Sequence, residues 1–229
     1  MNSPLATQLL FHLGPIPICA PVVVTWVIIA VLSLGSYLLT RRLNLAPGRT
    51  QAALELIVDT VDAQIADTMH VAPGPYRAFV GTLFIFIFTA NWSCLVPGVV
   101  PPTAHLETDI ALALLVFLAV IYFGILAGGM RGYLASFAVP NPVMIPLNFV
   151  ESLTRTFSLL VRLFGNVMSG VFVIGIVLSL AGLLVPIPLM ALDLLTGAVQ
   201  AYIFAVLAMV FIAQTLGEAK PTTQERIKP

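Results

Sequence analysis

Long apolar runs separated by short polar segments dominate the pattern of hydrophobic positions along this 229-residue chain. About 20 helical residues cross a bilayer core of about 30 Å, so each of these runs is long enough to span a membrane. The runs are continuous rather than alternating, which favours helices over the strands of a membrane barrel. The pattern predicts membrane helices at 22–40, 79–100, 110–129, 149–185 and 189–216.

A different periodicity occupies residues 50–70, between the first two runs. Its apolar residues recur at helical spacing, and its acidic residues fall on another face. This segment is predicted to be an amphipathic helix on the cytoplasmic surface of the membrane. A protein partner and plain solvent are equally compatible with its polar face. The apolar positions are Leu54, Ile57, Val58, Val61, Ile65 and Met69, and the acidic ones are Glu55, Asp59 and Asp62.

The last two runs are longer than a bilayer requires, and Pro186 and Pro188 are expected to close the first of them. As single helices they would measure about 55 Å and about 42 Å, at about 1.5 Å per residue. We therefore expect both to lie strongly tilted, or to bend at Gly165, Gly170 or Gly175. Such helices present a long flank to a neighbour inside the membrane, although the small residues along them also suit ordinary helix packing.

Composition supports a membrane protein. Hydrophobic residues make up 59% of the chain and charged residues 9%, against about 25% in a soluble domain. The formal net charge is zero and the mean hydropathy is +1.05. These values exclude a soluble enzyme, a nucleic-acid-binding protein and a disordered chain. We expect a single all-α integral membrane domain over residues 1–229.

The positive charges predict the orientation. With five spans, eight Lys and Arg residues fall on one side of the membrane, and none falls on the other. The excess marks the cytoplasmic side, so the N-terminus is expected outside and the C-terminus inside. Residues 1–20 contain no Lys or Arg, so the first run is predicted to be a retained anchor and not a signal peptide. The eight residues are Arg41, Arg42, Arg49, Arg77, Arg131, Lys220, Arg226 and Lys228.

A polar stripe crosses the fourth run. Steps of three or four residues place Glu151, Arg155, Ser158, Arg162, Asn166 and Ser169 on one helix face. An arginine at mid-membrane costs about 2.5–3.5 kcal/mol and cannot lose its proton. The stripe predicts the lining of an aqueous path, and the alternative is a structural Arg–acid pair within the bundle.

Arg162 is the residue of this stripe that most needs explanation. Glu151 can pair with Arg155, and Asp193 is the only other acid inside a run, so Arg162 has no evident partner in its own chain. A buried cation needs a counter-charge or water. A carboxylate about 4 Å away on another subunit would gain about 4 kcal/mol at an effective dielectric of 20, and would release any cation it carried.

Three motifs resemble a known family. The run Arg162-Leu163-Phe164-Gly165-Asn166, with Ser158 before it and Ser169-Gly170 after it, is similar to the signature of the a subunit of F-type ATP synthases. Gln200-Ala201-Tyr202-Ile203-Phe204 resembles that family's second motif. Asn91-Trp92, Pro97-Gly98 and Thr103 resemble the end of its second span. The resemblance covers most of the chain from about residue 80 onward.

The resemblance implies a function and partners. Such a subunit is a non-catalytic stator beside a rotating ring of c subunits, and two offset half-channels carry protons or sodium ions to and from the ring's carboxylates. The implied contacts are the c ring, through helices 149–185 and 189–216, and the b subunits of the peripheral stalk. The implied location is a bacterial plasma membrane, in a hetero-oligomeric complex with lipid around it. The resemblance implies no cofactor and no metal in this chain.

The resemblance also implies roles for individual residues that match functional positions of the family. Arg162 matches the essential arginine between the half-channels, while Asn166 and Gln200 match polar positions near it. Asp193 falls where relatives carry an ionisable residue, so we expect it to relay ions from outside. Glu151 is assigned to the cytoplasmic half-channel, and Arg155 falls where relatives often carry a basic residue. Two departures suggest a divergent branch: Val171 replaces a frequent Glu or His, and Asn148 replaces a frequent acid.

Other features are predicted to be less informative. His105, Glu107 and Asp109 are expected to be solvated loop residues, and the alternative is a place at the outer mouth of a channel. Cys19 and Cys94 are expected to be buried apolar side chains. No phosphate-binding loop is evident, so the chain itself is not expected to bind ATP.

Two alternatives to the stator remain. One is a secondary transporter with a charged midplane site, although no internal repeat is visible. The other is a structural scaffold, which would not need Arg162.

Overall fold

The computed structural model describes residues 9–13, 16–41, 48–96, 99–136, 144–181 and 185–219. Five of its helices are long and apolar enough to cross a membrane, which confirms the all-α integral membrane fold. Arg42, Lys220, Arg226, Lys228 and the Pro97-Gly98 step of the sequence analysis lie outside the described residues. The helices are α1 (Ala20–Thr40), α2 (Arg49–Met69), α3 (Gly74–Trp92), α4 (Leu106–Ser136), α5 (Met144–Ala181) and α6 (Pro186–Ala219).

Several helix ends differ from those expected from hydropathy. α3 begins five residues earlier than predicted, with a proline in its first turn, and ends at Trp92 before a short 3-10 turn. α6 begins at Pro186, which was expected to close the preceding helix. Proline suits the first helical position because it has no N–H to leave unbonded there. α4 extends past Gly129, whose φ of +70° breaks the helix at a residue that tolerates this conformation.

A short antiparallel hairpin precedes the first membrane helix and was not anticipated from the sequence. Its strands are β1 (Leu9–Leu13) and β2 (Ile16–Cys19), and β2 leads directly into α1. The membrane-spanning part begins after it, at Pro21. The hairpin's open edges therefore need not face lipid, which is the condition that excludes strands inside the bilayer.

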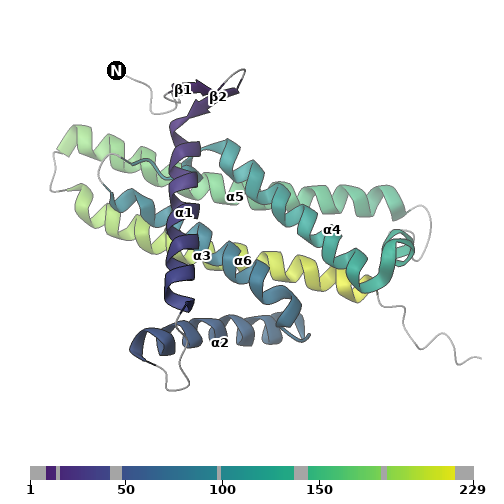
Figure 1. The fold of residues 1–229 in the computed structure, drawn as a ribbon. Coiled ribbons are helices and arrows are strands. Elements are labelled where there is room, and N and C mark those ends of the chain that lie inside the picture. The colour runs from purple at the N-terminus through teal and green to yellow at the C-terminus, as the bar shows by residue number, and fades with distance from the viewer. Residues whose placement is uncertain are drawn as a thin grey trace, which may run out of the picture.

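The long helices are tilted, as their length predicted. α5 and α6 cross the direction of α1 at a steep angle, whereas α2 lies across the end of α1 that is far from the hairpin (Figure 1). The backbone of α5 stays helical through Gly165, Gly170 and Gly175, so tilt accommodates its length without a break.

α6 is the central packing element and contacts α3, α4 and α5. One core cluster joins these four helices through buried side chains that include Ile87, Val116, Leu163 and Phe204. The small residues Gly197, Ala201, Ala205 and Ala208 of α6 are buried, so they serve close helix packing.

The amphipathic helix α2 is present, and its two halves differ. Ile65 and Met69 are buried in a second core cluster with residues of α3, α4 and α6. Asp62 forms an ion pair with Arg77 of α3, and the Tyr202 hydroxyl of α6 donates to Gln64 Oε1 at 2.8 Å. In its first half Ile57 and Val58 remain exposed and Leu54 is half-buried, so the buried part of the predicted apolar face lies in the second half.

A buried polar network joins α3, α6 and the 3-10 turn Pro102–Ala104. Asn91 Nδ2 donates to the Gly197 carbonyl at 2.8 Å, and the Thr103 hydroxyl donates to Asn91 Oδ1 at 2.7 Å. Leaving such a buried group unpaired costs about 1–3 kcal/mol. The network fixes this turn against α6 at a point one helical turn after Asp193.

Candidate functional site

The polar stripe of α5 lies on the side of the helix that faces away from the core. Leu159, Leu163 and Val167 are buried against the bundle. The side chains of the stripe are exposed at Glu151, Ser158, Arg162 and Ser169, and half-buried at Arg155 and Asn166. Glu151 and Arg162 are therefore open to whatever lies beside this chain in the membrane, whereas Arg155 is partly enclosed.

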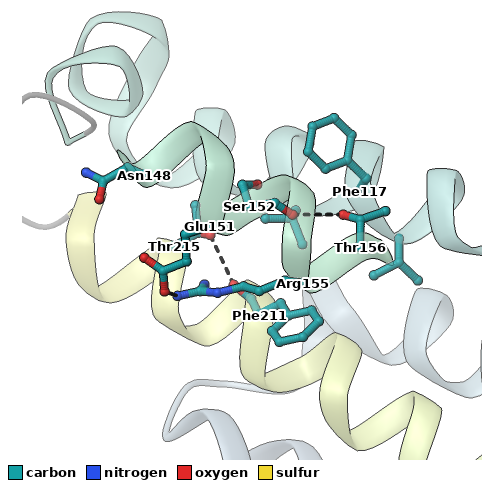
Figure 2. A pocket seen from close by; sticks show the side chains of 10 residues that line it. Phe117, Asn148, Glu151, Ser152, Arg155, Thr156, Phe211 and Thr215 are labelled. Atoms are coloured by element: carbon teal, nitrogen blue, oxygen red, sulfur yellow. Dashed lines mark hydrogen bonds and ion pairs between the residues drawn. The ribbon is translucent and has the colours of Figure 1, made fainter. Parts of the chain in front are cut away.

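The first half of α5 lines a pocket of about 600 Å³ together with α4 and the end of α6 (Figure 2). We call it the Arg155 pocket. Its walls combine polar side chains with Val116, Phe117, Val120 and Phe211. The polar members are Asn148, Glu151, Ser152, Arg155, Thr156 and Thr215.

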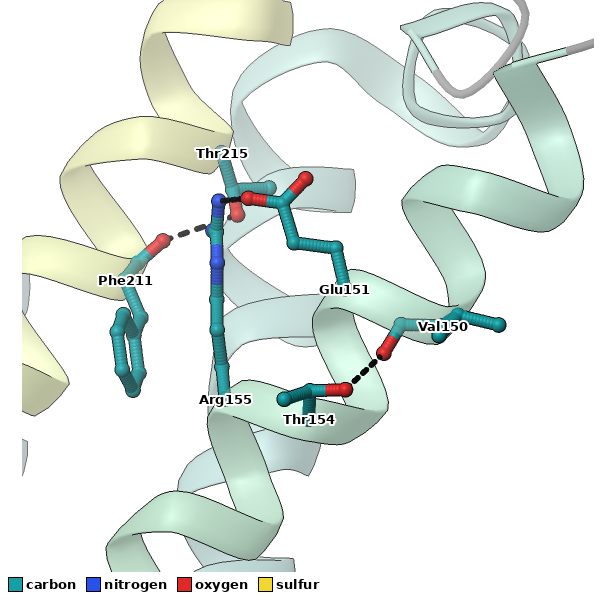
Figure 3. Close-up of polar contacts among 6 residues, drawn as sticks. All are labelled: Val150, Glu151, Thr154, Arg155, Phe211 and Thr215. Carbon is teal, nitrogen blue, oxygen red and sulfur yellow. Dashed lines mark hydrogen bonds and ion pairs between the residues drawn. The ribbon is translucent and has the colours of Figure 1, made fainter.

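Arg155 is held in this pocket by two contacts. Its guanidinium pairs with Glu151 one turn earlier, as the spacing predicted, and lies 5.7 Å from the centroid of the Phe211 ring on α6 (Figure 3). A cation over an aromatic face is attracted by the negative face of the ring. The Arg155 charge is thus neutralised within the chain by its ion pair with Glu151.

A second hollow, of about 520 Å³, lies between the second half of α5 and the first half of α6. We call it the Asp193 groove. It brings together Asn166 and Ser169 of α5 with Asp193 and Thr196 of α6, four polar residues among apolar ones. Three of the residues assigned from the sequence therefore meet in one place, although they lie on two helices.

Gly170 makes room for the Asp193 carboxyl group in this groove. A Cβ atom at position 170 would lie 1.9 Å from Asp193 Oδ1 and 2.7 Å from Cγ. Such a separation is far below van der Waals contact, so any other residue at position 170 would displace the carboxyl group. Gly170 thus belongs to the site through its lack of a side chain.

Arg162 lies between the two hollows. On α5 the Arg155 pocket ends at Thr156 and the Asp193 groove begins at Asn166, about 15 Å apart along the helix. Arg162 falls inside this gap. It makes no ion pair or hydrogen bond with any side chain that the structure describes, unlike Arg155.

Gln200 lies at the level of Arg162 but points inward. The antiparallel register of α5 and α6 follows from the approach of Gly170 to Asp193 and of Arg155 to Phe211, and it puts Gln200 opposite residues 163–166. The side chain is 5% exposed, and its Nε2 atom has no hydrogen-bond partner among the described residues. Gln200 lines neither hollow.

The polar residues at the beginning of α4 do not all behave as predicted. Glu107 is exposed, as expected, and His105 is half-buried. Burial lowers the pKa of the His105 imidazole, and the Glu107 charge partly opposes this shift. The prediction for Asp109 was wrong, because its side chain is fully buried. The neighbouring turn packs on α5, which encloses the beginning of α4.

Comparison with known proteins links this geometry to one family. Residues 22–213 match the family model described as ATP synthase A chain. A Bradyrhizobium sp. (strain BTAi1) protein named ATP synthase subunit a 2 is 56% identical over 216 residues, which cover 94% of this chain and 97% of that protein. A protein of the same name from Acaryochloris marina is 47% identical and covers 85% and 84% of the two chains. ATP synthase subunit a 1 of Hahella chejuensis is 40% identical, with coverages of 99% and 95%.

Proposed function

Because this chain belongs to the ATP synthase A chain family, we propose that it is the ion-conducting stator subunit of a rotary F-type ATP synthase. The observation that carries the proposal is the position of Arg162. This cation has no partner among the described residues, faces outward from α5, and separates two polar hollows. A carboxylate brought by a neighbouring ring of c subunits would supply the missing counter-charge.

The two hollows suit two offset half-channels. In the proposed route, an ion from outside enters the Asp193 groove and passes from Asp193 to a ring carboxylate near Asn166 and Ser169. After the ring turns, the ion leaves through the Arg155 pocket past Ser158 and Glu151 to the cytoplasm. Arg162 keeps the routes apart, because an ionised carboxylate beside it gains about 4 kcal/mol and so discharges its ion. Each charge that crosses gains about 2.3 kcal/mol per 100 mV.

The assembly context follows from the same proposal. The exposed flanks of α5 and α6 face the c ring, and the exposed first half of α2 is available to the b subunits of the peripheral stalk. The N-terminus lies outside a bacterial plasma membrane and the C-terminus in the cytoplasm, in keeping with the charge asymmetry. Val171 is apolar, so Asp193 carries the outer relay in the described part of the groove.

Cysteine cross-linking tests the proposed ring contact. Gly165 lies one turn after Arg162, and a Cβ there meets no atom within 4 Å. In the assembled complex with Cys19 and Cys94 replaced by serine, Gly165→Cys is expected to form a disulfide with a cysteine next to the ring carboxylate. Gly35→Cys on α1 is the matched control, because Gly35 has equally open surroundings. Equal cross-linking at both positions, or none at position 165, would contradict the ring contact.

A second prediction concerns Gly170. Gly170→Ala is expected to slow ion-driven ATP synthesis by about tenfold or more, because the new methyl group displaces the Asp193 carboxyl group from the groove. The rate is measured in membrane vesicles and normalised to assembled complex. Gly175→Ala is the control, since a Cβ at that position meets nothing within 4 Å. Equal rates in the two variants would show that the carboxyl position is unimportant.

A further inference from the structure

Asp109 is a buried carboxyl group without a partner. It lies in the first turn of α4, its side chain is 0% exposed, and neither Oδ1 nor Oδ2 accepts a hydrogen bond from the described residues. The ion pairs of the described chain join Arg77 to Asp62 and Arg155 to Glu151, so neither arginine neutralises Asp109. Burying an unpaired carboxylate is strongly unfavourable, so this group requires a proton or another cation from outside the chain.

Gln200 of α6 is a second buried group without a partner among the described residues. Gln200 Nε2 is the other buried side-chain polar atom that lacks a hydrogen bond in the described structure. Asp109 lies one turn before Leu112, and Gln200 directly precedes Ala201. Leu112 and Ala201 belong to one core cluster. Both polar residues thus neighbour members of that cluster in the sequence.

A hydrogen-bonded network joins Thr103, Asn91 and the Gly197 carbonyl. Thr103 precedes Asp109 by six residues and is itself fully buried, while Gly197 precedes Gln200 by one turn. The network ends one turn from Asp193 on α6. The network therefore links the turn before α4 to α6, one helical turn after Asp193.

We propose that Asp109 is a second ion-holding carboxylate, which binds the transported monovalent cation inside the bundle and exchanges it with the Asp193 groove. This inference rests on the proposed function, and it adds a binding site to the outer route. In this arrangement the ion reaches Asp193 from the α3–α4 side of α6 as well as along the groove.

The competing explanation is structural: the Asp109 carboxyl group could serve only the packing at the beginning of α4. Asparagine distinguishes the two. Asp109→Asn keeps the size of the side chain and one accepting oxygen, but it carries no negative charge and takes up no proton at neutral pH. A structural role therefore survives this substitution, and an ion-holding role does not.

The experiment uses the assembled complex in membrane vesicles. Asp109→Asn is expected to lower ion-driven ATP synthesis by about tenfold at limiting outer ion concentration, and Asp109→Glu to recover part of the rate. Rates are normalised to assembled complex, so lower assembly does not imitate slower transport. Glu107→Gln removes an exposed carboxylate two residues earlier, and its rate is expected to stay within about twofold of the original.

The ion species determines which parameter changes. For a transported proton, Asp109→Asn shifts the outer pH that gives half-maximal rate, and for sodium it shifts the half-maximal sodium concentration. Unchanged rate and unchanged half-maximal values in Asp109→Asn would overturn the inference. Failure of both Asp109→Asn and Asp109→Ser to assemble would also overturn it, because the carboxyl group would then serve packing.

Two outcomes distinguish a failure of this inference from a failure of the proposed function. If Arg162→Ala abolishes coupled transport while Asp109→Asn is unaffected, the stator assignment stands and only the Asp109 site is rejected. If Arg162→Ala leaves coupled transport intact, the stator mechanism is rejected and the Asp109 site with it.

Discussion

Replacing Arg162 with alanine is expected to abolish both ion-driven ATP synthesis and ATP-driven ion pumping in a complex that still assembles. An interaction of about 4 kcal/mol between Arg162 and a ring carboxylate corresponds to about three orders of magnitude in rate. Assembly should survive because Arg162 is exposed and makes no ion pair or hydrogen bond with the described side chains of its own chain. Its removal thus leaves no buried group without a partner.

Three measurements check this prediction: synthesis rate, pumping rate and the amount of complex in the membrane. Arg41→Ala is the matched control, because Arg41 is an exposed arginine at the end of α1, far from both hollows. Its rates should remain within about twofold of the original. Arg162→Lys keeps the charge but not the planar guanidinium, so it should recover only part of the rate. Coupled rates in Arg162→Ala that equal those of Arg41→Ala would reject the stator mechanism.

Replacing Asp193 with asparagine is expected to slow both directions of coupled transport by about 100-fold, with assembly unchanged. A positioned group that accepts and donates a proton typically contributes at least this factor. Asp193 is half-buried in the groove, against Gly170 and on the same wall as Thr196. Asparagine fills the same volume but cannot carry an ion, so the loss would report chemistry and not packing.

Two comparisons make the Asp193 result specific. Asp193→Glu restores an ionisable group with one extra methylene and should recover more rate than asparagine, although the contact with Gly170 leaves little space. Glu107→Gln, which removes an exposed carboxylate that is expected on the same side of the membrane, should change the rate by no more than about twofold. If Asp193→Asn and Glu107→Gln behave alike, the outer relay lies elsewhere.

Hydropathy predicted the membrane helices well because lipid offers no hydrogen-bonding partners to the backbone. Each spanning segment must satisfy its own N–H and C=O groups, so an apolar run of sufficient length becomes a helix. The ends were less predictable, since hydropathy does not detect capping. Pro186 was expected to close one helix and instead begins α6. The hairpin before α1 gave no signal of its own, because its residues are apolar like those of the helix that follows.

The candidate site was partly predictable for a related reason. Arg162 and the stripe around it are visible in sequence, because charge inside an apolar run is costly and helical periodicity shows which residues share a face. The Glu151–Arg155 pair followed from their spacing of one turn. Asp109 was misjudged because three polar residues near a loop resemble a solvated segment until the packing of neighbouring helices is known.

By itself, the sequence determined that this chain lies in a membrane, how many helices can cross it, and that one arginine lacks a partner nearby in the sequence. These properties depend on local composition and on the cost of placing a charge in lipid. Both can be evaluated from the linear sequence without knowledge of contacts between distant residues. Only the tertiary structure decided that Asn166, Ser169 and Asp193 share a groove, that Arg162 separates it from the Arg155 pocket, and that Asp109 is enclosed. The register and tilt of α4, α5 and α6 set these relations, and they arise from side-chain packing between residues that are distant in the sequence.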